Sequence, residues 1–193
     1  MNTTELFVEH LITGLMSIAW IMLFSLGLID FNLSTIPLFH GFEAIALIFV
    51  FSMAYPLGIF TDNLADSLLK RWNNSIRKKY ELEKNGITVA RVLMTIKNED
   101  VSKYFNYVRM RIRIARSAVV NFLLITISSI LFLTIHKNSS DILISFKLIL
   151  TVGIIGLILT LWALWSWKNI VSNYHKMSKR ILEEYTRIQN DLT

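Results

Sequence analysis

The sequence has no cysteine, two prolines and seven glycines among its 193 residues, and only 18% of them are charged. Without cysteine the chain cannot form disulfides, thiolate metal sites or cysteine nucleophiles. No run rich in glycine and serine divides it, so we expect a single membrane domain, residues 1–193. The hydrophobic share of 53% exceeds that of an ordinary soluble domain, and the charged share falls below it. This composition favours a protein that lies mostly in lipid.

Motifs of common enzyme classes are also missing from the sequence. It contains no phosphate-binding glycine-rich loop with Lys-Ser/Thr, no His-Glu-x-x-His and no Gly-x-Ser-x-Gly. The topology argued below keeps the four histidines apart from one another; they are His10, His40, His136 and His175. We therefore expect a non-enzymatic protein with no cofactor and no metal site.

Four stretches contain no Asp, Glu, Lys or Arg: residues 11–29, 44–60, 117–135 and 148–167. Each is close to the roughly 17 to 25 residues that an α-helix needs to cross about 30 Å of hydrocarbon. A chain of this length has too little polar material to bury four such helices in a soluble core. We predict an all-α, polytopic membrane protein with four transmembrane helices, at residues 8–29, 41–60, 117–136 and 145–167.

Positive charge is concentrated between the second and third predicted spans. Residues 61–116 hold 13 of the 20 Lys and Arg residues, and the tail from residue 168 holds 5 more. The positive-inside rule places both segments in the cytoplasm. Because the chain crosses the bilayer four times, the N-terminus is expected there too. We predict a multi-pass protein of the plasma (inner) membrane with both termini in the cytoplasm.

Apolar residues at helical spacing continue beyond three of the predicted spans. One stripe begins at Ala65 after span two, a second leads through Phe105 into span three, and a third continues from Ile170 after span four. We expect helices two, three and four to extend into a cytoplasmic helical bundle. It would consist of a basic antiparallel hairpin, residues 61–116, and an amphipathic tail helix, residues 168–193, that packs against the hairpin.

The densest group of charged residues lies where this hairpin meets the membrane. Asp62 and Asp66 are one helical turn apart, and Arg109, Arg113 and Arg116 share one face just before span three. Similar depth in an antiparallel hairpin predicts ion pairs between the two groups, made by Arg113 or Arg116. Three roles stay open. They are a structural clamp that also anchors to anionic headgroups, which we favour, a charged pore vestibule formed by several copies, and a catalytic carboxylate pair.

Small residues give the spans smooth faces for close helix packing, within one subunit or between copies. They are Gly14 and Ser17 in span one, Ala54 and Gly58 in span two, and Gly153, Gly156 and Thr160 in span four. The central turns of the spans carry no ionisable side chain, which argues against proton- or ion-coupled transport by one subunit. Aromatic residues beside the basic segment favour headgroup contact, with nucleic acid as a weaker alternative.

The plan of the whole chain has four spans, a basic helical hairpin, an amphipathic tail and no catalytic motif. It resembles the four-span accessory membrane proteins of type VI-B CRISPR and related antiphage systems. The group with HEPN-type Arg and His residues is a poorer match, because this sequence lacks that spacing. Its most distinctive string is Arg109-Met-Arg-Ile-Arg-Ile-Ala-Arg-Ser117. The resemblance implies a non-enzymatic effector or modulator in bacterial antiviral defence.

Two functions are consistent with these features. The first is a homo-oligomeric membrane effector that forms a pore or perturbs the bilayer under control of its cytoplasmic helices. The alternative is a scaffold or anchor that recruits a soluble effector protein, or a small channel or transporter subunit unrelated to defence. The expected partners are the lipid bilayer, further copies of the chain and a cytoplasmic effector protein.

Overall fold

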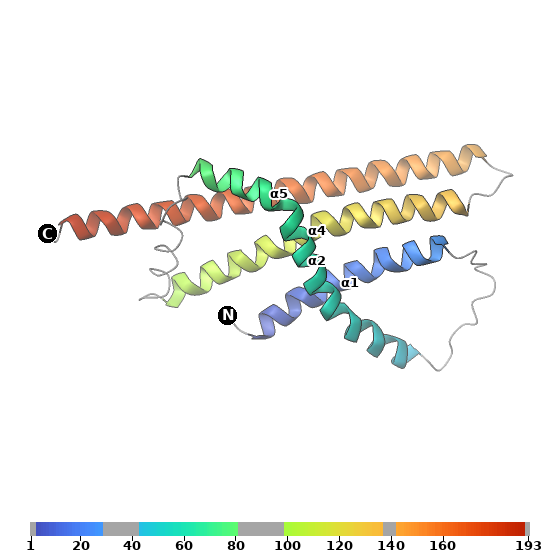
Figure 1. The fold of residues 1–193 in the computed structure, drawn as a ribbon, viewed down its shortest axis with the longest axis horizontal. Helices are drawn as coiled ribbons and strands as arrows, with labels where there is room; N and C mark the ends of the chain where they lie inside the picture. The colour runs from blue at the N-terminus through green and yellow to red at the C-terminus, as the bar shows by residue number, and fades with distance from the viewer. Residues whose placement is uncertain (1–2, 29–42, 81–98, 137–141, 192–193) are drawn as a thin grey trace.

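The computed structural model describes residues 3–28, 43–80, 99–136 and 142–191. These form α1 (Thr3–Leu28), α2 (Glu43–Lys79), α4 (Glu99–Ile135) and α5 (Ile142–Asp191) (Figure 1). All four helices are long and apolar enough to cross a membrane, which confirms the prediction of an all-α chain with four candidate spans. Outside the described residues lie His40, the predicted span ends at residues 29, 41 and 42, and residues 81–98 of the predicted hairpin.

Three of the helices are longer than a bilayer requires. α2 and α4 each contain 37 residues, and α5 contains 50. At 1.5 Å per residue they are about 55 Å and about 75 Å long, against about 30 Å of hydrocarbon. α2 also continues through Pro56 without ending. The helices therefore run on beyond the predicted spans, along the apolar stripes of the sequence.

The helices form a layer of three with the fourth lying diagonally across it (Figure 1). α1 contacts α4 and α4 contacts α5, while α2 touches all three. α1 and α4 run in the same direction, because Glu9 and Ser17 each contact the α4 residue 104 positions later. α5 runs antiparallel to α4, so α1 begins and α5 ends on the same side of the layer (Figure 1). Among the described residues, α2 and α4 thus meet at a crossing.

The second half of α2 packs across α4 and α5. Leu69 of α2 is buried with Val119 of α4 and with Trp167 and Val171 of α5. Further along, Phe105 of α4 is 2% exposed and packs against two residues of the predicted tail seam, Tyr174 and Ile181. The stripes predicted from the sequence are therefore the surfaces by which these helix extensions hold one another.

The burial pattern differs from that of a soluble helical bundle. Polar side chains are buried between the helices, among them Glu9, Thr13, Ser17, Thr61 and Asn121. Large apolar side chains stay exposed along the first half of α2 and between residues 146 and 165 of α5. In hydrocarbon, apolar side chains gain nothing by hiding, whereas polar groups must find partners inside the protein. This pattern suits helices that face lipid.

Small residues bring two pairs of helices into close contact. A methyl group added at Gly14 would overlap the carbonyl of Ala54, and one at Gly58 would overlap the carbonyl of His10, so α1 and α2 cross backbone to backbone. A methyl group at Gly156 of α5 would meet the side chain of Thr126 of α4. At Gly153 it would make only an ordinary contact, 3.6 Å from Ile130. Thr160 donates to the carbonyl of Gly156 at 2.8 Å.

Candidate functional site

A polar cluster lies where α2 crosses the seam between α1 and α4. α1 contributes Glu9, Thr13 and Ser17, and α4 contributes Arg113, Ser117 and Asn121. Both rows advance by four residues, which keeps them on one helix face. From above the seam α2 adds Thr61, Asp62 and Asp66, and Arg116 of α4 completes the set. We call these ten residues the polar joint.

Glu9 and Arg113 join α1 to α4. Arg113 Nε lies 3.1 Å from Glu9 Oε1, an ion pair by distance. The Glu9 residue is 1% exposed, and its oxygens accept no hydrogen bond within the part of the chain that the structure describes. The contact therefore has the distance of an ion pair without the direction of a hydrogen bond. A buried carboxylate is costly unless a cation compensates it, and Arg113 supplies that charge.

Arg116 joins both aspartates of α2. Its Nη2 lies 2.6 Å from Asp62 Oδ1, and its Nη1 pairs with Asp66. The two side chains of the Asp62 contact are 14% and 15% exposed, whereas Asp66 is 59% exposed. Ser117 also donates to Asp62 Oδ1 at 3.3 Å. Asp62 is thus the better buried partner, and its pairing with Arg116 contributes more to stability than that of the solvated Asp66.

Hydrogen bonds between the helices extend the polar joint from its charged residues toward the apolar part of the layer. The hydroxyls of Ser17 and Thr61 are 2.6 Å apart, and Ser17 donates to Asn121 Oδ1 at 3.1 Å. Asn121 in turn donates to the backbone carbonyl of Thr13 at 3.1 Å. Each of these four residues is buried, and each has a partner on another helix. The joint therefore fixes the relative height of α1, α2 and α4.

Arg109, the remaining residue of the predicted charged cluster, has its partner on α5. Arg109 donates from Nε to the hydroxyl of Tyr174 on α5 at 3.3 Å. It still borders the open groove between α2 and α4 that Asp62, Asp66, Arg113 and Arg116 also line. The structure thus brings all five predicted residues to one groove. Among the ion pairs, Arg116 takes both aspartates while Arg113 pairs with Glu9.

Glu9 and Asn121, with Thr13, Thr61 and Ser117, are the parts of the joint that sequence reasoning missed. Glu9 reads as the acidic lead of span one, and Asn121 reads as one of several polar residues within span three. The available signal was the matched spacing of the two polar rows, which would have aligned Glu9 with Arg113 had α1 been placed beside α4. The spacing of the polar residues in α1 alone does not predict that α4 is the neighbouring helix.

The arrangement suits a clamp better than a catalytic centre. Glu9 pairs with Arg113, and Asp62 and Asp66 both pair with Arg116, so each carboxylate of the joint has a guanidinium partner. No group of three or more His, Asp or Glu residues placed to hold a metal occurs within the described ranges. The family comparison, the search of curated proteins and the search of solved structures each find no match to this chain.

Proposed function

We propose that this protein is a non-enzymatic membrane effector or accessory protein that acts as a homo-oligomer. The polar joint carries the proposal, because it lies between the apolar part of the layer and the helix extensions that bear most of the charge. α2 and α4 are continuous through it. A change in the extensions would therefore shift the spans as rigid rods, which is the kind of coupling that a controlled effector needs.

The proposal places these extensions in the cytoplasm as a helical bundle. The cation-rich segments of α2, α4 and α5 lie on the side of the layer where α1 begins and α5 ends (Figure 1). The positive-inside rule assigns that side to the cytoplasm and the spans to the plasma membrane. With this orientation a cytoplasmic signal reaches the extensions first and the polar joint second.

The exposed face of α5 supports assembly of several copies. Within the described residues α5 packs mainly on α4 and touches α2 only near the crossing. Its apolar face includes Ile155, Ile158 and Trp162, each more than half exposed. Such a face can meet lipid or a second copy equally well. A pore or a membrane defect would then form between copies.

The likeness to antiphage accessory proteins extends the proposal to bacterial antiviral defence. It rests on the plan of four helices with long extensions and on the absence of catalytic motifs from the sequence. In that setting the signal would come from a cytoplasmic effector protein that binds the extensions. Expression of the intact gene during phage infection, compared with an Arg116→Gln variant, measures this part of the proposal by phage titre.

Reconstitution tests the effector function directly. The purified chain is placed in liposomes of stated phospholipid composition, dye release is followed, and oligomeric state is measured in the same lipid. We expect an oligomer that releases dye. Arg116→Gln is expected to change the release, whereas Lys179→Gln, at an exposed pair with Glu183 on α5, leaves it unaltered. A monomer that releases nothing would rule out the pore.

A scaffold is the second candidate, and the exposed basic residues of the extensions favour it. They include Lys70 and Arg71 on α2, Arg111 on α4, and Lys176 and Arg180 on α5. A surface of this charge suits an acidic soluble partner. Co-purification of such a partner, lost when the arginines between 109 and 116 are replaced by Gln, together with intact liposomes, would favour the scaffold over the effector.

A further inference from the structure

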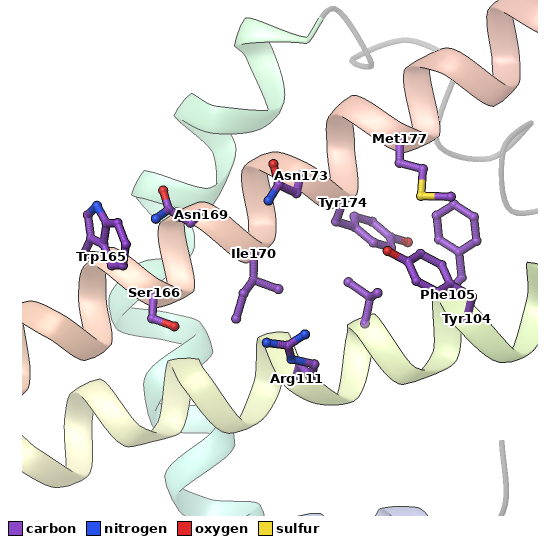
Figure 2. Close-up of a pocket in the computed structure, with 11 residues that line it drawn as sticks. Tyr104, Phe105, Arg111, Trp165, Ser166, Asn169, Ile170, Asn173, Tyr174 and Met177 are labelled. Atoms are coloured by element: carbon purple, nitrogen blue, oxygen red, sulfur yellow. The ribbon is translucent and has the colours of Figure 1, made fainter.

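A furrow runs along the seam between α4 and α5, on the face away from α2. Its first section has a volume of about 210 Å³ and is shown in Figure 2. Its lining includes the polar side chains of Arg111 from α4 and of Ser166, Asn169 and Asn173 from α5. Aromatic and apolar residues also line it, namely Tyr104, Phe105, Val108, Trp165, Ile170, Tyr174 and Met177. Arg111 extends from α4 toward α5 in this view (Figure 2). Among the residues that the structure describes, it is the only charged one that lines this section.

The second section of the furrow is apolar and follows directly from the first. Small and large apolar residues line it, namely Ala115, Ala118 and Phe122 from α4 and Leu159, Trp162 and Ala163 from α5. Ser166 lines both sections, which joins them. On each helix the lining residues recur every three or four positions, in places as adjacent pairs, so they form one continuous face. Along its length the furrow therefore passes from a section that holds Arg111 and two asparagines to a section lined by apolar residues and Ser166.

The change in the lining of the furrow lies at the same height as a change on the exposed surface of α5 from apolar to polar residues. Leu161, Trp162 and Trp165 are exposed apolar residues, and the exposed residues that follow are Lys168 and Asn169. Tryptophan is enriched where hydrocarbon meets the headgroups, and charged residues begin beyond it. The polar section of the furrow thus stands at headgroup depth, and the apolar section lies within the hydrocarbon.

We propose that the furrow binds one anionic glycerophospholipid. Its phosphate accepts hydrogen bonds from Arg111, whose planar guanidinium can hold two oxygens at once, and from the amides of Asn169 and Asn173. Arg111 lies over the ring of Tyr107, 5.7 Å from the ring centroid, which helps to orient it. One acyl chain follows the apolar section past Ala118. This site lies apart from the polar joint, and it shares Trp162 with the apolar face of α5 proposed for assembly.

The order of chemistry along the seam identifies a lipid as the occupant. A free phosphate ion would use the polar section alone and leave the apolar section without a role. The apolar face of a helix from a second copy would cover the apolar section but would place no anion at Arg111. A phospholipid carries one negative group at one end of a long apolar chain, and this is the order that the furrow presents.

Native mass spectrometry of the full-length protein in detergent tests the site. The protein is titrated with phosphatidylglycerol and, separately, with phosphatidylcholine of the same acyl chains. We expect a preference for phosphatidylglycerol, and Arg111→Gln should weaken its binding about tenfold, as expected for the loss of a charge-assisted hydrogen bond. Arg71→Gln is the matched control, because it removes an exposed arginine from α2. It should alter binding less than about twofold.

Two further arms separate the lipid from other occupants. Ala118→Trp fills the apolar section and should weaken both lipids, while excess inorganic phosphate should displace neither. Helical content and elution volume identify variants that fail to fold, and Arg111 is exposed, so its replacement leaves the core intact. Equal losses in Arg111→Gln and Arg71→Gln would overturn the proposal, as would displacement by phosphate. A dimer that dissociates in Ala118→Trp without any lipid effect would assign the furrow to a second copy.

Discussion

Two arginines of α4, one turn apart, serve different neighbours. Arg116 binds the aspartates of α2, and Arg113 binds Glu9 of α1. A guanidinium group offers five donors in a fixed plane, so it can hold two carboxylates in a defined geometry, which the rotatable ammonium of a lysine does not impose. Asp62 gains a further donor from Ser117. At the residue scale the polar joint therefore balances each buried charge with an opposite charge on another helix.

The Glu9 and Arg113 pair can be tested by a double-mutant cycle. Glu9→Gln leaves Arg113 without its carboxylate, and we expect it to lower the free energy of unfolding by about 2 kcal/mol. This is below the value for a fully buried pair because the Arg113 side chain is 26% exposed. Arg113→Gln should cost a similar amount, and the double variant clearly less than the sum. Unfolding in mixed detergent micelles, followed by helical circular dichroism, measures each term.

The exposed pair of Lys179 and Glu183 is the control for this cycle. Its side chains are 40% and 63% exposed and lie four residues apart on α5. The corresponding Gln variants should show a coupling of about 0.5 kcal/mol or less. If the coupling of Glu9 with Arg113 were no larger than this, the ion pair would not hold α1 against α4.

At the scale of elements, the crossing of α1 and α2 depends on the absence of side chains. Gly14→Ala should destabilise the protein by about 2 kcal/mol or more, because the added methyl group meets the backbone carbonyl of Ala54 and the helices must separate. Gly153→Ala is the matched control. Its methyl group lies 3.6 Å from Ile130 and should be neutral or slightly stabilising. The same unfolding measurement compares them, and equal effects would contradict a backbone contact at Gly14.

The last part of α5 is expected to pack on α4 within one chain. The rings of Phe105 and Tyr174 lie 5.5 Å apart, edge to face. Because the protein has no cysteine, the pair Phe105→Cys and Tyr174→Cys can be introduced without a background. Oxidation should give an intramolecular cross-link that migrates as a monomer. The pair Phe105→Cys and Lys176→Cys places the second thiol on another face of α5 and should not form it.

A cross-linked dimer of the first pair would have a different meaning. It would show that the tail helices of two copies pair with each other, as in a coiled coil. The seam of Ile170, Tyr174 and Ile181 is close to the heptad spacing, so both outcomes are physically available to the sequence.

Helical periodicity in the sequence predicts the elements well and their neighbours poorly. The runs without charge predict four helices, and the separate stripes that contain Leu69 and Phe105 predict the continuation of α2 and α4, because burial of one face is a local property of a helix. The partner of that face is not local. Asp62 and Arg116 belong to one charged cluster, and the opposite charges of that cluster predict their ion pair. Glu9 pairs with Arg113 because α1 lies alongside α4, which the sequence of α1 does not predict. Backbone contacts such as that of Gly14 with Ala54 depend on the same choice of neighbour.

At the scale of the whole molecule, one diagonal helix holds the layer together. α2 contacts α1 around Gly14 and Gly58, α4 at the polar joint, and α5 around Trp167 and Val171. It thus links α1 to α5, which make no direct contact within the described residues. A movement of α2 would therefore reach all three other helices, and its place across the polar joint makes it the element through which control of the spans is expected to act.

The predicted orientation of this layer can be tested with single cysteines and a membrane-impermeant maleimide. Ser75 of α2 and Met177 of α5 are exposed on the helix extensions, and residue 139 lies in the predicted connection between spans three and four. The cation-rich side should face the cytoplasm. Ser75→Cys and Met177→Cys should therefore react in inside-out vesicles and not in right-side-out ones, while Ser139→Cys should react in the opposite way. If Ser75→Cys and Ser139→Cys were labelled from the same side, α4 could not cross the membrane between them. The four-crossing topology would then have to be abandoned.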